Sequence, residues 1–235
     1  YLFCFLISLN LSAQKPSAKD ESKKPKKEKT YKDIITKDAI TDKGLFDIHK
    51  VKEKYFYEIN DSLLGREMLM VTRIAKTASG LGFGGGKQNT QVLRWQIKDN
   101  KILLRVVSHN VVASDSLPVN EAVLNSNFEP ILYSFKIESK GIDSTSTLIE
   151  VTKLFNEDVK PLGFPQSRRK GYKISSLNSK KSFIESIKSY PENIESRHVK
   201  TYNSSSPPSN SSTGTISLEI NNSMILLPKT PMKRR

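Results

Sequence analysis

The fold class is decided by residues 92–107, which read VLRWQIKDNKILLRVV. Leu93, Trp95 and Ile97 alternate with polar residues, and this two-residue period is typical of a strand with one buried face. Asp99 and Asn100 predict a tight turn, and residues 102–107 supply an apolar return strand. The stretch is therefore predicted to be an antiparallel β-hairpin.

Similar patterns lie on both sides of this hairpin. Residues 68–74 are almost all apolar, which predicts a strand covered on both faces. Helix is scarce: Ser182 and Glu185 have the spacing of a capping box, so a helix is predicted from there to Pro191, and residues 118–124 predict a second. The expected fold is mainly β with a minor α+β component, made of antiparallel hairpins in a β-sandwich-like arrangement. The remaining strands are predicted at residues 45–51, 55–59, 131–137, 148–154 and 216–220, with a turn at 141–146.

The composition changes sharply near the N-terminus. Residues 2–11 are apolar but too short to cross a bilayer, and Ala13 is suited to signal peptidase, so residues 1–13 are predicted to be a signal peptide truncated at its start. Export is therefore expected. Cys4 lies within the signal, which leaves no thiol for a disulfide or a thiolate zinc site. Residues 14–30 then predict a lysine-rich spacer, 31–75 a small β domain, and 76–235 a second β-rich domain, incomplete at its C-terminus, with a disordered loop at 203–213.

The formal net charge of +14 raises the possibility of nucleic-acid binding. Its distribution argues against that function, because residues 15–30 hold seven lysines against three acids and residues 229–235 add four more positive charges. Such tails are typical of solvated spacers, and they lack interleaved aromatic residues. Neither nucleic-acid binding nor a membrane span is expected.

Local motifs give no catalytic chemistry. Residues 80–87 read GLGFGGGK, but Leu81 and Gln88 stand where a phosphate-binding loop needs glycine and a hydroxyl residue, so a flexible loop is expected. The histidines, His49, His109 and His198, are too widely spaced for a helical zinc pair and are expected on strands or loops. No catalytic, metal-binding or cofactor-binding residue is assigned, although free spacing leaves a Ser-His-Asp triad open.

Two sets of charged residues are candidates for a function, one basic and one acidic. Arg168, Arg169 and Lys170 form a basic cluster that could pair with an acidic partner, but a solvated turn is the favoured interpretation. The acidic residues show no pairing pattern, and the following are expected to be loop and cap residues: Asp115, Glu121, Glu157 and Asp158.

Several blocks, in order, carry a family resemblance. They are GLFDIHKV (44–51), YFYEI (55–59), LLGREML (63–69), VLRW (92–95), NSNFEPI (125–131), SFIESIKSYPENIE (182–195), SMILLP (223–228) and PM (231–232). Through these blocks the chain is similar over residues 31–235 to the opening of secreted bacterial zinc-dependent metalloproteases of the met-zincin type, where this stretch forms two adjoining domains of unknown function. The resemblance implies a His-Glu-x-x-His zinc helix further downstream, and this sequence contains no such motif.

These observations leave two main hypotheses. In the first, the chain is a non-catalytic accessory region whose partner is a downstream metallopeptidase domain of the same polypeptide, with a protein or peptide substrate and zinc held elsewhere. In the second, it is a free-standing exported module that binds peptide or glycan through strand edges or the 80–87 loop.

Overall fold

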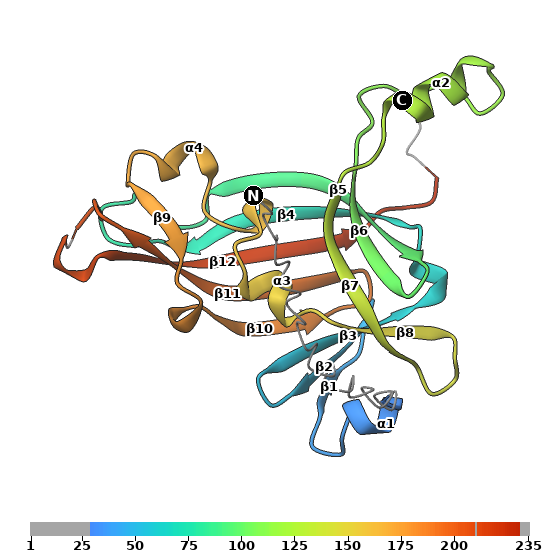
Figure 1. The fold of residues 1–235 in the computed structure, drawn as a ribbon, viewed down its shortest axis with the longest axis horizontal. Coiled ribbons are helices and arrows are strands. Elements are labelled where there is room, and N and C mark those ends of the chain that lie inside the picture. Colours follow the sequence, from blue (N-terminus) through green and yellow to red (C-terminus); the bar gives the residue numbers. More distant parts are fainter. Residues whose placement is uncertain (1–28, 210, 231–235) are drawn as a thin grey trace, which may run out of the picture.

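The computed structural model describes residues 29–209 and 211–230, and this part of the chain is mainly antiparallel β-structure with a few short helices, as predicted (Figure 1). The helical elements are α1 (Tyr31–Ile34), η1 (Asp61–Leu63), α2 (Val119–Ser126), α3 (Thr152–Asn156), η2 (Lys160–Leu162), α4 (Gln166–Arg169), η3 (Ser179–Lys181) and η4 (Ser211–Thr213). The strands are β1 (Ile40–Asp42), β2 (Asp47–Val51), β3 (Lys54–Asn60), β4 (Glu67–Lys76), β5 (Lys87–Lys98), β6 (Lys101–Val107), β7 (Ile131–Lys140), β8 (Ser146–Glu150), β9 (Ile174–Leu177), β10 (Phe183–Ser189), β11 (Asn193–Ser204) and β12 (Thr215–Leu226).

All of these strands belong to one sheet that curls into a nearly closed barrel. Its order is β1-β2-β3-β8-β7-β6-β5-β4-β12-β11-β10, with β9 beside β11. The two ends meet where the Leu45 backbone N donates to Tyr190 O at 2.7 Å and Ser189 N donates to Asp42 Oδ2 at 3.0 Å. The ranges predicted as two domains therefore share one sheet, in which β4 lies between β5 and β12.

The inward face of the sheet forms the core. On β4, Met68, Met70 and Ile74 are buried, while Leu69 and Val71 on the other face are half-buried. The prediction that both faces of this strand are fully covered is therefore wrong. In an antiparallel sheet a strand can bury one face in the core and leave the other partly exposed.

Aromatic side chains fill the centre of the barrel. Trp95 packs edge-on against Phe46 and Tyr57, with ring centroids 5.9 and 6.2 Å apart. A second cluster fills the end of the barrel near β9 and α4, and it includes Phe164 and Tyr202. The core thus runs the length of the barrel.

The hairpin of residues 92–107 is confirmed as β5 and β6, with Asp99 at φ 52° in the turn between them. The predicted helix at 118–124 is also confirmed as α2. It lies on an arm, residues 108–130, that projects from the barrel between β6 and β7 (Figure 1). No helix in the described part of the chain is long and apolar enough to span a membrane.

The helix predicted from Ser182 to Pro191 is wrong, because this stretch is strand β10. The Ser182 hydroxyl does not cap a helix; it donates to Asn178 O at 2.8 Å and accepts from Thr201 N at 3.0 Å. Ile187 is buried and Lys188 is exposed, so the pattern has a period of two. Pairing with β11, which includes a bulge between Ile184 and Ser186, overrides the local helix signal.

Two other boundaries differ from expectation. The strand predicted at 148–154 ends at Glu150, and α3 follows from Thr152. The loop predicted at 203–213 lies between β11 and β12, but Asn203 and Ser204 still belong to β11. Residue 210, the predicted signal (1–13) and most of the predicted spacer (14–30) lie outside the described residues.

Candidate functional site

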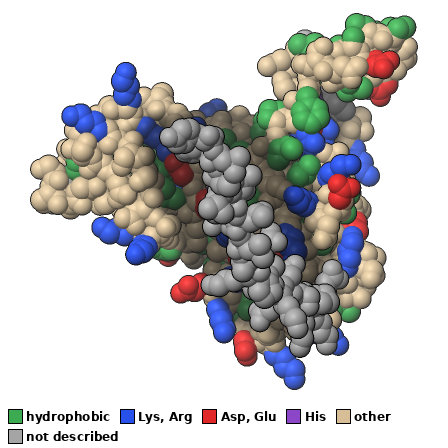
Figure 2. Space-filling view, viewed as in Figure 1, with side chains coloured by type: hydrophobic (Ala, Val, Ile, Leu, Met, Phe, Trp, Pro, Cys, Tyr) green, Lys and Arg blue, Asp and Glu red, His purple; other side chains and the backbone are tan. Residues whose placement is uncertain are grey.

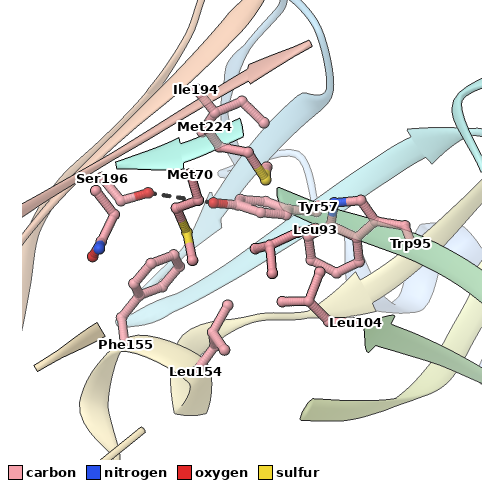
Figure 3. Close-up of a pocket in the computed structure, with 11 residues that line it drawn as sticks. Tyr57, Met70, Leu93, Trp95, Leu104, Leu154, Phe155, Ile194, Ser196 and Met224 are labelled. Atoms are coloured by element: carbon pink, nitrogen blue, oxygen red, sulfur yellow. Dashed lines mark hydrogen bonds between the residues drawn. The ribbon is translucent and has the colours of Figure 1, made fainter. Parts of the chain in front are cut away.

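The barrel interior is the first place to look for a ligand site, and apolar side chains pack its centre. A cavity of about 10 Å³ lies there, lined by Tyr57 and Trp95 and by Leu154 and Phe155 of α3 (Figure 3). That volume suits one water molecule at most. Its lining is mostly apolar, with polar groups from Tyr57, Ser196 and Asn222, and Tyr57 Oη lies 3.4 Å from Ser196 Oγ. This cavity therefore does not admit a substrate-sized molecule.

A segment of the chain packs against the inward face of the sheet. Residues 152–170, here called the plug segment, carry α3, η2 and α4, and their side chains Leu154, Phe155 and Leu162 are buried. Inward side chains of β4, β5 and β11 bind the backbone of this segment. Thr72 Oγ1 and Asn89 Nδ2 donate to Pro161 O (3.1 and 3.4 Å), His198 Nε2 to Leu162 O (3.3 Å) and Lys200 Nζ to Glu157 O (2.6 Å), while Tyr202 Oη accepts from Phe164 N (3.0 Å).

Burial changes the titration of the basic members of this set. His198 is fully buried, and burial, with the nearby Lys200 charge, lowers its pKa to about 3. Burial likewise lowers the pKa of Lys200 to about 8. Both groups donate hydrogen bonds to the plug backbone.

The basic cluster at the end of the plug segment is not the solvated turn that was predicted. Arg169 makes a bidentate ion pair with Asp158 at 2.6 and 2.7 Å and lies over the Tyr202 ring. These hydrogen bonds lower the pKa of Asp158. Arg168 donates to Leu81 O at 3.1 Å and lies over the Phe164 ring. The two arginines bind the chain itself, so they are not free for an acidic partner.

A second polar cluster lies around Glu58 on β3. Its carboxylate accepts hydrogen bonds from Tyr31 Oη at 2.6 Å, His49 Nε2 at 2.9 Å and Ser146 Oγ at 2.5 Å. These bonds, led by that from His49, lower the pKa of Glu58 to about 2. The cluster connects α1, β2, β3 and β8.

The Glu58 cluster contains a hydroxyl–imidazole–carboxylate chain, because Thr41 Oγ1 lies 2.8 Å from His49 Nδ1. The chain has the order of a catalytic triad. Acyl transfer also needs N–H donors aimed at a bound carbonyl, and Thr41 lies in neither of the two cavities described here. These contacts have a structural role: the hydrogen bond between Thr41 and His49 fixes β1 against β2.

The outer face of β10, β11 and β12 holds a polar groove of about 310 Å³. At its centre, Glu195 accepts from Asn193 Nδ2 at 3.0 Å, Asn221 Nδ2 at 2.9 Å and the Ser223 hydroxyl. These donors hold the carboxylate in one orientation. The groove is lined by Ser186, Lys188, Tyr190, Glu195, Arg197 and Asn221.

The structure distributes the residues singled out from the sequence over separate places. His49 and His198 lie on strands and His109 on a loop, as predicted, and each has a different partner. Among the described residues, no group of three or more His, Cys, Asp or Glu side chains is arranged to hold a metal ion. Residues 80–86 form a loop, as predicted, with Leu81 buried and Phe83 almost fully exposed, and Lys87 begins β5.

Sequence reasoning missed the side chains that hold the plug segment. Thr72, Asn89, Lys200 and Tyr202 were not singled out, because each binds backbone atoms that only the folded chain brings near. Residues 196–203 read SRHVKTYN, and the polar residues at both alternating positions leave no two-residue period that would signal these side chains.

The described residues define a class of fold: a nearly closed, barrel-like antiparallel sheet with residues 152–170 packed on its inward face. The family model described as Domain of unknown function (DUF5117) matches residues 85–235, and the chain belongs to that family. A second model, Domain of unknown function (DUF5118), matches residues 28–77. No curated protein and no solved structure matches the chain.

Proposed function

We propose that this chain is the non-catalytic accessory region of an exported zinc-dependent metallopeptidase whose catalytic domain lies downstream in a longer polypeptide. The structural observation that supports the proposal is the plugged interior. Because the inward polar groups of β11 are used on the plug segment, we expect contacts with another domain on the outer surface. The ordered blocks of sequence similarity supply the class of enzyme.

The described residues do not fit a zinc site of their own. His49 is bonded to Glu58 and Thr41, His109 lies 3.1 Å from Glu67, and His198 donates to a backbone carbonyl. No zinc ligand is therefore assigned to this chain, and no reaction step is derived for it. Under the proposal, zinc and its general base belong to the downstream domain.

The proposal is tested on the complete reading frame. It predicts an in-frame His-Glu-x-x-His sequence after Arg235, and a full-length product that cleaves casein and loses this activity with a zinc chelator. The 235-residue chain alone is expected to leave casein uncleaved. A complete frame that lacks the motif would reject the proposal.

Export is part of the same proposal. Signal peptidase cleavage after Ala13 would give a secreted or periplasmic product that begins at Gln14. Cell fractionation and the mass of the N-terminal peptide measure this directly. Recovery of the uncleaved chain from the cytoplasm would contradict it.

The outer groove favours a second candidate function, a free-standing exported module that binds peptide or glycan. An exposed aromatic ring, Tyr190, lies beside the fixed Glu195 carboxylate and Arg197, a combination suited to hydroxyl and amide ligands. A glycan and peptide array would show binding that Glu195→Gln and Tyr190→Ala remove. Complete lack of binding would leave the accessory function as the better account.

A further inference from the structure

The arm of residues 108–130 exposes an unusual amount of apolar surface. None of the residues of α2 is buried, and Leu124 and Phe128 are 65% and 76% exposed. Figure 2 shows the apolar side chains gathered on the projecting arm and at its base. Grouped apolar exposure of this kind marks an interaction surface. The other exposed apolar residues of the arm are Val111, Val112, Leu117 and Val119.

The charge of the arm limits what can cover it. Residues 108–130 include Asp115, Glu121 and Glu129 but no lysine or arginine, in a chain with a net charge of +14. An anionic membrane surface would repel such an arm. The complementary surface is that of a protein, apolar at its centre and basic at its rim.

The base of the arm is fixed to the point where the chain leaves the sheet. Leu227 N donates to Glu67 O at 3.0 Å, and Arg66 donates to Leu227 O at 2.7 Å. The Glu67 carboxylate in turn contacts His109, on one stem of the arm, at 3.1 Å.

The other stem is fixed through an arginine. Arg94 pairs with Glu67 at 2.8 Å and with Glu129 at 3.0 Å. Both stems and the end of β12 therefore meet at one polar junction, and a domain joined after β12 would begin beside the arm.

We infer that the arm is the docking surface for the catalytic domain that follows in the longer polypeptide, which deepens and rests on the proposed function. The domain would bury α2 and the flanking valines under an apolar patch, and basic residues around that patch would face the acids of the arm. Because the domain would follow in the same polypeptide, this contact would be intramolecular, which favours it.

The test compares hydrogen–deuterium exchange of residues 108–130 in the complete polypeptide and in the 235-residue chain. Docking is expected to slow exchange of the α2 amides at least tenfold in the complete polypeptide. The double variant Val112→Glu plus Leu124→Glu is expected to remove this protection. The matched control is Ile142→Glu, because Ile142 is 74% exposed and lies in the turn between β7 and β8. Circular dichroism checks that each variant is folded.

The possible outcomes separate the two proposals. A complete polypeptide without a metallopeptidase domain rejects the proposed function, and the inference with it. A polypeptide that has the domain but shows equal exchange of the arm in both proteins overturns only the inference. Concentration-dependent protection of the arm in the 235-residue chain alone would also overturn it, since a second copy would then be the occupant.

Discussion

Two basic side chains lie inside the barrel, where charge is costly. His198 and Lys200 are both fully buried on β11, and each finds a carbonyl oxygen of the plug segment. Because a buried charge is far less stable than a buried neutral donor, the pKa of each group falls. The two residues therefore make the stability of the barrel depend on pH.

Acid is expected to weaken the fold through His198. Its pKa is about 3 in the folded chain against an ordinary 6.5, so below pH 6.5 only the unfolded chain gains the proton. The stabilisation is complete above pH 6.5 and is lost as the pH falls toward 3, by about 1.4 kcal/mol per pH unit. Urea unfolding between pH 5 and 7.5 should show this slope in the wild type and not in His198→Gln. The surface variant His109→Gln is the control, and an unchanged slope in His198→Gln would contradict the assignment.

Lys200 is expected to act in the alkaline range. Its pKa is about 8 in the folded chain against 10.5, so the folded chain loses the proton first as the pH rises. The free energy of unfolding of the wild type should then increase between pH 8 and 10, relative to Lys200→Met, by about 1.4 kcal/mol per unit. Urea unfolding of both proteins at pH 7, 8, 9 and 10 measures the difference. A constant difference would mean that Lys200 stays charged throughout.

At the scale of elements, the plug segment and β11 depend on each other. Tyr202 Oη accepts the Phe164 N–H, which is otherwise buried without a partner. Tyr202→Phe should therefore lower the free energy of unfolding by about 1–3 kcal/mol. It should also speed amide exchange at Phe164 more than at β4. Equal exchange at Phe164 in both proteins would show that the plug segment is held without this bond.

Local sequence predicted some elements and failed for others for a physical reason. The β5–β6 hairpin has alternating residues and its own turn, so its signal is complete within residues 92–107. Strand β11 has no such signal, because polar side chains occupy its inward positions in order to bind the plug segment. In β10, a local capping pattern at Ser182 competes with pairing to β11, and the pairing determines the structure.

At the scale of the whole molecule, closure of the sheet could not be predicted from local patterns. Strand β4 pairs with β12 although about 150 residues separate Thr72 from its partner Asn222. The mainly β class followed from alternation, but a curled single sheet depends on such distant pairs. The contacts of the plug segment with β4, β5 and β11 depend on the same distant pairing, whereas the outer groove lies on three consecutive strands, β10, β11 and β12.

The seam that brings the two ends of the sheet together gives the sharpest test of the whole fold. A Cβ at Gly44 would lie 2.8 Å from the Ser189 carbonyl carbon and from Tyr190 N, closer than real contacts allow. Gly44→Ala should therefore push β10 away and weaken the bond from Leu45 N to Tyr190 O. The expected loss is about 1–3 kcal/mol, or about 2–4 °C in Tm for each kcal/mol.

Gly171→Ala is the matched control for the seam, because its added Cβ would meet only Arg168 O at 3.7 Å, an ordinary contact. Thermal unfolding of the three proteins by circular dichroism measures the difference. Since β1, β2 and β3 lie at one end of the sheet and β10 at the other, an open seam should also speed exchange at the Leu45 amide in Gly44→Ala alone. Equal Tm values for the two variants would mean that the seam adds nothing to the stability of the barrel.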